Sequence, residues 1–353
     1  MPDPSPPAVA ISAVIVVRDE AGEIGDCVSA LAGLADEVVV YDAGSGDDTV
    51  SLARAAGAVV VDGFWDGDLG RARNAAAATA AGDWLLVVGA DERVAGDAAG
   101  LRAALAGDGP DVPDIRSVFV RDTAAEGLGE GHHEWSDRLV RRGAVHWVGR
   151  VQERLIRDDG LPPVTETLPP HLLRVEHLGY ADPEVARRKG EHRAHLAEAE
   201  LHALLRLRPH DRAGITDALL ALGRSLVTAG RPQDAVDTFE TLRELAPRTS
   251  QWLEGTDYLA RVLLGGGGHD DAVLFLSDQL RAGGTDPRYC DWLRAQALAQ
   301  LGSPAEALAL VRDVDELVDA GGRHLDPARV RELRSLLATL VDQRRPEETS
   351  AAT

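Results

Sequence analysis

Residues 84–92, Trp-Leu-Leu-Val-Val-Gly-Ala-Asp-Glu, form a strongly apolar segment that ends in two carboxylates. A short continuous apolar run is typical of a buried strand, and it places Asp91 and Glu92 at the carboxyl edge of a sheet, where open α/β folds bind their ligands. Such carboxylates could hold a divalent metal. Because acidic pairs are also common at helix N-termini and in solvated turns, the neighbouring loops must decide between these interpretations.

Two other segments place charged and amide groups where strands are predicted to end or helices to begin. Asp19 and Glu20 follow an apolar run almost directly. The segment Gly70-Arg71-Ala72-Arg73-Asn74 opens a predicted helix. Arginines and the positive end of the helix dipole together favour a phosphate group at that position. We therefore expect Arg73 and Asn74 to lie beside a bound phosphate.

A glycine-containing loop, Asp-Ala-Gly-Ser-Gly-Asp-Asp-Thr at residues 42–49, follows the apolar segment Val-Val-Val-Tyr. Its glycines, Gly44 among them, allow the backbone to approach a ligand closely. Asp42 can accept hydrogen bonds from a base or a ribose. The alternative is a simple helix entrance with Ser45 or Asp47 as the N-cap, and both descriptions can hold together.

Short apolar runs alternate with amphipathic segments between residues 10 and 90, which is typical of a parallel α/β sheet with right-handed crossovers. We predict strands at residues 10–17, 37–42, 58–62 and 84–89, and helices at residues 23–34, 47–56 and 70–81. Shorter strand-like runs, separated by glycine-rich or proline-rich turns, follow at residues 117–121, 138–142, 144–148 and 151–156. They are expected to form the mixed, less regular half of the same domain.

The chain beyond Tyr180 has a helical pattern that repeats. Three glycines are each followed five residues later by an alanine, in the pairs Gly230 and Ala235, Gly267 and Ala272, and Gly302 and Ala307. We expect glycine to end one helix, proline to open the next and alanine to allow close packing. Prolines then close each unit, at Pro247, Pro287 and Pro327. The pattern resembles tetratricopeptide repeats with a polar capping helix at residues 328–344, and a generic helical bundle is the alternative.

The composition indicates a soluble protein of more than one domain. Its 353 residues are 44% hydrophobic and 27% charged, and a single core of ordinary size does not extend over such a length. Asp and Glu number 58 against 37 Lys and Arg, a balance that disfavours nucleic acids and anionic membranes as partners. We find no signal-peptide pattern and no apolar run of transmembrane length. With Cys27 and Cys290 as the only cysteines, we expect a cytoplasmic protein without disulfides or cysteine metal clusters.

Four motifs in a fixed order carry a family resemblance. They are Val-Arg-Asp-Glu at 17–20, Val-Val-Val-Tyr-Asp-Ala-Gly-Ser-Gly-Asp-Asp-Thr at 38–49, Ala-Arg-Asn-Ala at 72–75 and Ala-Asp-Glu at 90–92. Together they resemble a family 2 glycosyltransferase with the GT-A fold, and they are most similar to the subgroup of lipopolysaccharide-core β-glucosyltransferases. The resemblance covers residues 10 to about 180. Family 2 domains followed by tetratricopeptide repeats are known, including enzymes that glycosylate peptides.

The resemblance assigns nucleotide-binding roles to residues in the first three motifs. It implies that Asp42 contacts the nucleobase and that Arg73 lies at the diphosphate. It also implies that Asp19 or Glu20 lies beside the nucleotide.

In the fourth motif, Asp91 matches the last aspartate of the family's Asp-x-Asp sequence, which ligates the Mg or Mn that bridges the two phosphates. Such cations prefer oxygen ligands and neutralise the charge that builds on the departing diphosphate. Gly89 stands where the family has the first aspartate, so the resemblance predicts the direct ligand without its usual neighbour. His177 aligns with a family histidine near the donor site.

An inverting transfer also needs a base that takes the proton of the acceptor. Glu134-Trp135-Ser136-Asp137, just before Arg-Leu-Val-Arg-Arg, resembles an aspartate-containing segment of the subgroup. Spacing back from the arginines favours Glu134 as the base, with Asp137 second, and an acidic turn before an edge strand is the alternative. Trp135 is a candidate for stacking on a sugar or acceptor.

These features predict an α/β GT-A domain with a Rossmann-like, mixed sheet at residues 10–180 and an all-α, TPR-like repeat domain at 181–345, with disordered ends at 1–9 and 346–353. The predicted activity is inverting transfer of a sugar from a nucleotide-diphosphate donor to a peptide, protein or glycan. A UDP-sugar is the favoured donor. The repeats would hold this acceptor, a partner or a second copy of the chain.

The alternative is a catalytically silent protein in which Gly89 marks lost activity and the repeats form an interaction module. A nucleotidyltransferase would need a glycine-rich, lysine-containing loop that residues 17–23 lack.

Overall fold

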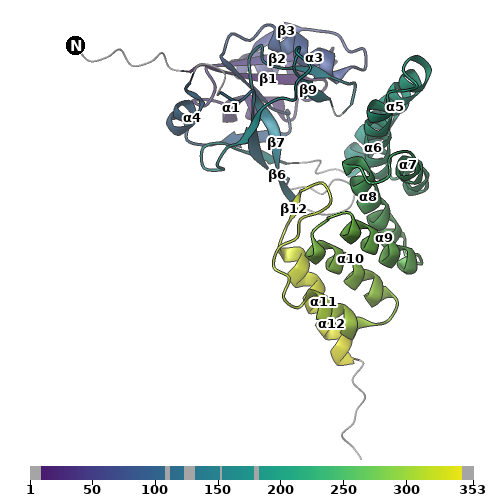
Figure 1. Ribbon diagram of the computed structural model, residues 1–353. Helices are drawn as coiled ribbons and strands as arrows, with labels where there is room; N and C mark the ends of the chain where they lie inside the picture. Colours follow the sequence, from purple (N-terminus) through teal and green to yellow (C-terminus); the bar gives the residue numbers. More distant parts are fainter. Residues whose placement is uncertain (1–8, 108–111, 123–131, 152, 179–182, 344–353) are drawn as a thin grey trace, which may run out of the picture. The chain divides into compact units, whose positions relative to one another are not determined.

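The computed structural model describes residues 9–107, 112–122, 132–151, 153–178 and 183–343. The chain divides into two compact units, Met1–Ala124 with Glu134–Ala181, and Ala125–His133 with Asp182–Thr353. Apart from Val9, the ends predicted to be disordered lie outside the described residues. The predicted fold class is confirmed, because a mixed α/β unit is followed by a helical one (Figure 1).

The first four strands of the α/β unit are parallel where they pair, in the order β3-β2-β1-β4. They are β1 Ile11–Val17, β2 Glu37–Asp42, β3 Val59–Asp62 and β4 Trp84–Val87. Successive side chains of a strand point to opposite faces, and both faces of β1 are buried. All four strands agree with the prediction to within two residues, and β1 and β4 are the continuous apolar runs expected of strands buried on both faces.

Helices cover both faces of this sheet. The helices α1 Ile24–Ala30, α2 Thr49–Ala55 and α4 Ala98–Leu105 share a core with Ile11, Ala13 and Ile15 of β1. On the opposite face, α3 Leu69–Ala77 packs with Val14 and Val39. The predicted helices at 23–34, 47–56 and 70–81 are therefore present, each shorter than expected.

The other half of the sheet is mixed, as predicted. It contains β5 Glu92–Ala95, β6 Ile115–Asp122, β7 His132–Arg141, β10 Thr165–Thr167 and β11 Arg174–His177. β7 is antiparallel to β4, and β11 is parallel to β6 and antiparallel to β5. β8 His146–Val148 and β9 Arg154–Ile156 form a separate two-stranded sheet. Glu92 thus opens a strand rather than a helix, a feature that the sequence did not predict.

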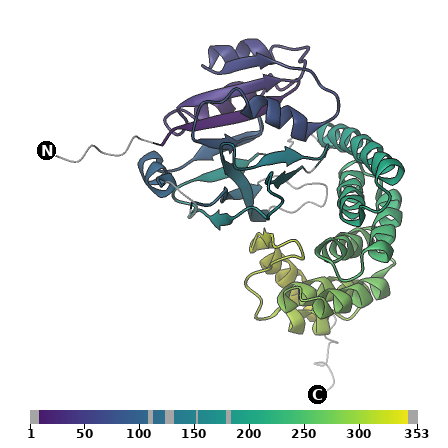
Figure 2. The ribbon, with the colours of Figure 1, turned by 45° about the horizontal axis from the view of Figure 1, so that its top comes forward.

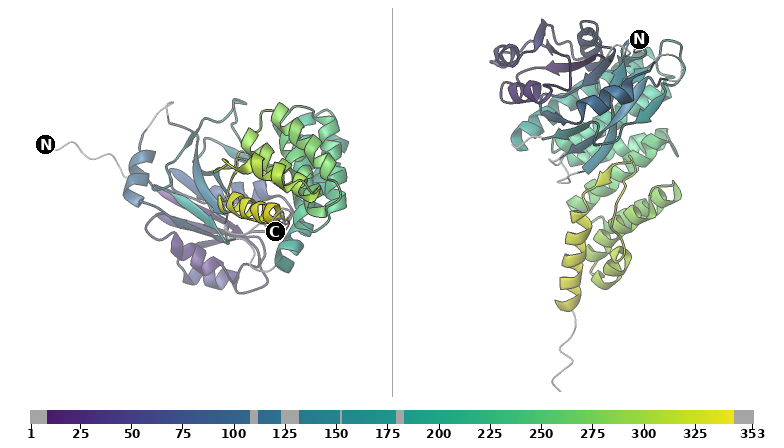
Figure 3. Two further views of the ribbon diagram at one scale, coloured as in Figure 1. Left: turned by 90° about the horizontal axis from the view of Figure 1, so that it is seen from below. Right: turned by 90° about the vertical axis from the view of Figure 1, so that its left-hand side faces the viewer.

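The second unit is a series of helices in which each packs against the next (Figure 2). They are α5 Pro183–Leu207, α6 Arg212–Thr228, α7 Pro232–Leu245, α8 Ser250–Gly266, α9 Asp270–Ala282, α10 Pro287–Gln300, α11 Pro304–Val311 and α12 Ala328–Gln343. The last of them, drawn in yellow in Figure 3, matches the predicted capping helix. A short strand, β12 His324–Leu325, pairs with His132 and His133, which belong to the same unit. Among the described helices, none combines the length and the apolar character needed to cross a membrane.

The expected glycine, proline and alanine pattern holds in two of its three copies. Gly230 and Gly302 have positive φ angles of 71° and 86°, and a proline begins the following helix in each case. Ala235 and Ala307 are fully buried. In the remaining copy the prediction is wrong, because α9 begins three residues after Gly267 instead of two. Ala272 is therefore exposed, and the next residue, Val273, fills the core position.

Candidate active site

The carboxyl ends of β1, β2 and β4 lie at one edge of the sheet, because the three strands are parallel. Val17 at the end of β1 pairs with Asp42 at the end of β2, and Val14 of β1 pairs with Val87 of β4. The loops that begin at residues 18, 43 and 88 therefore leave the sheet side by side. These are three of the four loops to which the sequence assigned ligand-binding residues.

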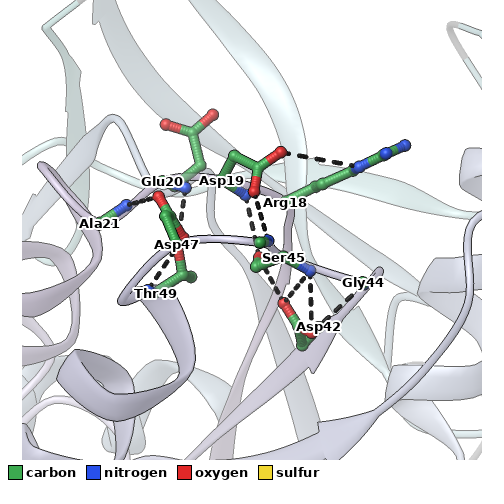
Figure 4. A network of polar contacts seen from close by, with 10 residues as sticks. Arg18, Asp19, Glu20, Ala21, Asp42, Gly44, Ser45, Asp47 and Thr49 are labelled. Carbon is green, nitrogen blue, oxygen red and sulfur yellow. Dashed lines mark hydrogen bonds and ion pairs between the residues drawn. The ribbon is translucent and has the colours of Figure 1, made fainter.

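The loops after β1 and β2 are joined by hydrogen bonds (Figure 4). The Asp42 carboxylate accepts hydrogen bonds from the backbone N–H of Gly44 and Ser45 at 3.2 Å and from the Ser45 hydroxyl at 2.6 Å. The Ser45 Oγ in turn accepts a hydrogen bond from Asp19 N at 2.9 Å. Asp19 returns one, since its Oδ1 accepts from Gly46 N at 2.7 Å. Asp42, only 7% exposed, thus shapes its own loop.

A second set of bonds holds Glu20. Its backbone N–H donates to Thr49 Oγ1 at 2.8 Å, and the next residue, Ala21, donates to Asp47 Oδ2 at 3.2 Å. The Thr49 hydroxyl also bonds the Asp47 carboxylate, and this bond lowers the pKa of Asp47. The carboxylate of Glu20 points away from Asp42 in Figure 4. Asp48 is the N-cap of α2 and makes no side-chain cap bond, so neither Ser45 nor Asp47 is the N-cap.

The start of α3 is already occupied by protein groups. Asp68 caps it by accepting from Arg71 N at 2.8 Å, and the N–H groups of Leu69 and Gly70 donate to carbonyls of Arg150 and Gly149. The Asn74 side chain holds β8, with Nδ2 donating to Trp147 O at 2.7 Å and Oδ1 accepting from Trp147 N at 3.0 Å. A phosphate at this helix end would compete with these contacts.

Arg73 of α3 lies in a partly buried cluster of charged side chains. Its guanidinium is 2.5 Å from Glu153 Oε1, and the Glu153 side chain is only 6% exposed. Burial lowers the pKa of Arg73, while Glu153 opposes that shift and the nearby Arg138 adds to it. The cluster pairs Arg73 with Glu153 and Arg138 with Glu92, so its positive and negative charges balance.

Asp91 faces a histidine from the neighbouring half of the sheet. β5 and β11 pair with His177 opposite Glu92, and His177 Nε2 lies 3.4 Å from Asp91 Oδ2, with both side chains less than one-fifth exposed. A carboxylate and an imidazole suit Mn, and the carboxylate suits Mg. Within the described residues, no group of three or more His, Cys, Asp or Glu side chains is arranged for a metal. Asp91 and His177 would supply at most two of the ligands of such a cation.

Glu92, next to Asp91, is buried instead of facing a ligand. It is 3% exposed, its Oε2 accepts from Gly89 N at 2.6 Å, and its Oε1 accepts from Arg138 at 2.7 Å. Glu92 is thus occupied by protein contacts, and Asp91 remains the candidate ligand of the two carboxylates. The partner of Glu92 could not be found from the sequence, because Arg138 lies 46 residues further along the chain.

The two candidate bases lie on β7. Residues three apart on a strand project to opposite faces, so Glu134 and Asp137 are expected to face different sides of the sheet. Asp137 Oδ1 accepts from the Ser117 hydroxyl of β6 at 2.6 Å. Trp135 is 40% exposed and lies edge-on to Phe119, with ring centroids 5.4 Å apart.

Comparisons with known proteins match parts of the chain. Residues 12–135 match the family model described as glycosyl transferase family 2. A stretch of 84 residues, 24% of this chain, is 42% identical to a TPR repeat-containing protein of Synechococcus elongatus and covers 21% of it. Over 84 residues the chain is 37% identical to an uncharacterized glycosyltransferase of Rickettsia felis and covers 29% of that protein. The chain thus spans less than a third of the length of these relatives.

Similarity to solved structures is weaker. S. aureus TarS 1-349 is 13% identical, with a TM-score of 0.36, and the match covers 90% of this chain and 96% of that one. The assignment comes instead from the sequence match of residues 12–135, which contain the loops after β1, β2 and β4. Residues 12–135 of this chain therefore resemble a family 2 glycosyltransferase domain.

Proposed function

We propose that this domain transfers a sugar, with inversion, from a nucleotide-diphosphate donor, with UDP as the nucleotide, to a peptide, protein or glycan. The main support for the proposal is that the loops after β1, β2 and β4 lie at one edge of the sheet. They bring Asp19, Asp42 and Asp91 to that edge. The position agrees with the rule that ligands of open α/β sheets bind beyond the carboxyl ends of the strands.

In this proposal the first two loops hold the nucleoside. Asp42 shapes the turn that receives the base, since its carboxylate accepts hydrogen bonds from Gly44 and Ser45. Gly44 has a φ of +90° and open space where a side chain would be, so its backbone can approach the base. Asp19 and Glu20 flank the nucleotide. Arg73 acts on the diphosphate through its positive charge.

Asp91 is the proposed metal ligand, with His177 beside it. A Mg or Mn ion bound there would offset the negative charge that develops on the leaving diphosphate. The chain's own contribution is to hold the Asp91 carboxylate at the sheet edge, 3.4 Å from the imidazole of His177. The backbone N–H of Leu178 supports this arrangement by donating to Asp91 O at 3.0 Å.

Glu134 is the proposed base. It would accept the proton of the acceptor hydroxyl or thiol as the bond to the sugar forms, and the bond from the sugar to the diphosphate breaks. Asp137 is the second candidate, and its carboxylate already accepts a hydrogen bond from Ser117. Trp135, exposed on the same strand, shares a face with Asp137 and is a proposed platform for the acceptor in the arrangement with Asp137 as the base.

The proposal extends to the second unit. We assign residues 10–180 to the transferase domain and 181–345 to a TPR-like domain that holds the acceptor, a partner or a second copy. Paired helices that begin with proline after a glycine support this part of the proposal. The resemblance to lipopolysaccharide-core β-glucosyltransferases supports a hexose as the transferred sugar.

A thermal-shift screen of UDP, GDP and dTDP sugars, each with and without Mn, tests the function. A ligand at a hundred times its dissociation constant stabilises a protein by about 2.7 kcal/mol. We expect a UDP sugar with Mn to give the largest rise in the unfolding temperature. A screen in which no donor shifts the unfolding temperature would contradict the proposed function.

A further inference from the structure

The position of Gly89 is bounded by two carboxylates. A side chain added there would place its Cβ 2.8 Å from Asp91 Oδ1 and 3.4 Å from Glu92 Cδ. A third carboxylate at this position would therefore lie beside two others, and like charges at such distances repel strongly. An aspartate at position 89 would therefore require the Asp91 carboxylate to move.

Glu92 forms hydrogen bonds with both backbone groups of Gly89. Its Oε2 accepts from Gly89 N at 2.6 Å, and its own backbone N–H donates to Gly89 O at 3.1 Å. The other carboxylate oxygen accepts from Arg138 of β7 at 2.7 Å. Since the side chain of Glu92 is only 4% exposed, this bridge from the loop to β7 is shielded from water.

Further contacts fix the remaining carbonyls of the loop. Gly89 O also accepts from the Cys27 thiol at 3.2 Å, and burial raises the pKa of Cys27 to about 12, so that the thiol keeps its proton. Ala90 O accepts from Arg93 at 3.1 Å, and Asp91 O accepts from Leu178 N. These contacts tie the turn to α1, to β5 and to the residue that follows β11.

We propose that Glu92 is a positioning residue for Asp91. By bridging Gly89 N and Arg138, it holds the turn in which Asp91 faces His177. The effect on metal binding rests on the proposed function, whereas the effect on the loop does not.

The proposal predicts a result opposite to simple restoration of the motif. Gly89→Asp should weaken the binding of Mn with UDP, because the new carboxylate displaces Asp91. Removing the neighbouring charge in Gly89→Asp/Glu92→Gln should recover part of that loss. The two substitutions are therefore expected to be non-additive, as contacting residues are.

The test uses the full chain and two readouts. Binding of Mn in the presence of UDP is followed by the electron paramagnetic resonance signal of free Mn, and amide hydrogen exchange of the peptide containing residues 85–92 is measured without ligand. We expect Glu92→Gln and Arg138→Gln each to weaken Mn binding by about 10- to 100-fold, as is usual for residues that orient a ligand. Both variants should also speed exchange in the loop.

Asp114→Asn is the matched control. Asp114 is likewise buried, pairs with Arg141 and Arg157, and accepts from the backbone N–H of Val164. It supports the opposite end of β7, because its backbone carbonyl accepts from Arg141 N. Its substitution should lower the unfolding temperature as Glu92→Gln does, yet leave Mn binding and exchange in residues 85–92 unchanged.

Either of two results would overturn the positioning role. One is unchanged loop exchange in Glu92→Gln and Arg138→Gln. The other is tighter Mn binding by Gly89→Asp alone. If the unsubstituted protein binds no Mn with UDP while Glu92→Gln still speeds loop exchange, the proposed function fails and the positioning role stands.

Discussion

The carboxylates at the sheet edge show how neighbours along the chain acquire different roles. Asp91 and Glu92 are adjacent, yet Asp91 faces His177 and Glu92 is buried against Arg138. The difference arises because Asp91 lies in the turn that begins at Gly89, whereas Glu92 is the first residue of β5. Residue type alone therefore does not identify the ligand.

A pair of variants on β7 separates the two candidate bases. Glu134→Gln should lower the turnover of a UDP sugar by about 10²- to 10⁴-fold, the usual contribution of a general base, with the donor affinity unchanged. Asp137→Asn should have a much smaller effect. Equal losses in both variants, or a larger loss in Asp137→Asn, would show that the base has been assigned wrongly. Release of UDP measured at saturating donor is the readout.

At the scale of elements, the sequence identifies the strands whose two faces are buried and misses those that depend on a partner. β1 and β2 are continuous apolar runs, and they lie where they were predicted. β5, Glu-Arg-Val-Ala, is half polar and forms by pairing with β11, whose Val175 lies opposite Val94. Such pairing is invisible to a local pattern.

The same limit applies to the site. The loops that carry Asp42 and Asp91 could be predicted, because each follows an apolar strand directly. The contacts of Asn74 with Trp147 and of Arg73 with Glu153 join residues distant in the sequence. No spacing rule reveals them, and they change the expected roles of both residues.

A buried carboxylate in α8 makes the stability of the helical unit depend on pH. Asp257 accepts from the Tyr289 hydroxyl and faces Arg261, Asp319 and Arg323. Burial raises its pKa, the Asp319 charge adds to the rise, and Arg261 opposes it. The folded state therefore binds this proton more tightly than the unfolded state.

Stability should consequently fall as pH rises from the ordinary aspartate pKa to the raised value, and then level off. Asp257→Asn should flatten this part of the profile, as measured by urea unfolding between pH 4 and about 8. A profile as steep in the variant as in the unsubstituted protein would assign the pH dependence to another group.

At the scale of the whole molecule, the chain has separate hydrophobic cores. Buried residues between Ala194 and Leu337 form one core, and the two cores of the α/β unit contain residues between Ile11 and Val175. Proteins built in this way commonly depart from two-state unfolding. We expect calorimetry to show two transitions, of which Mn with UDP raises only one. A single transition that moves as a whole would contradict this expectation.

The central claim is that the sheet edge binds a metal–nucleotide complex through Asp91, and isothermal titration of UDP with Mn into the full chain tests it most directly. The unsubstituted protein should bind, and Asp91→Asn should lose at least about tenfold in affinity, equivalent to about 1.4 kcal/mol. Unchanged affinity in Asp91→Asn, or no binding of UDP, GDP or dTDP by the unsubstituted protein, would contradict the claim.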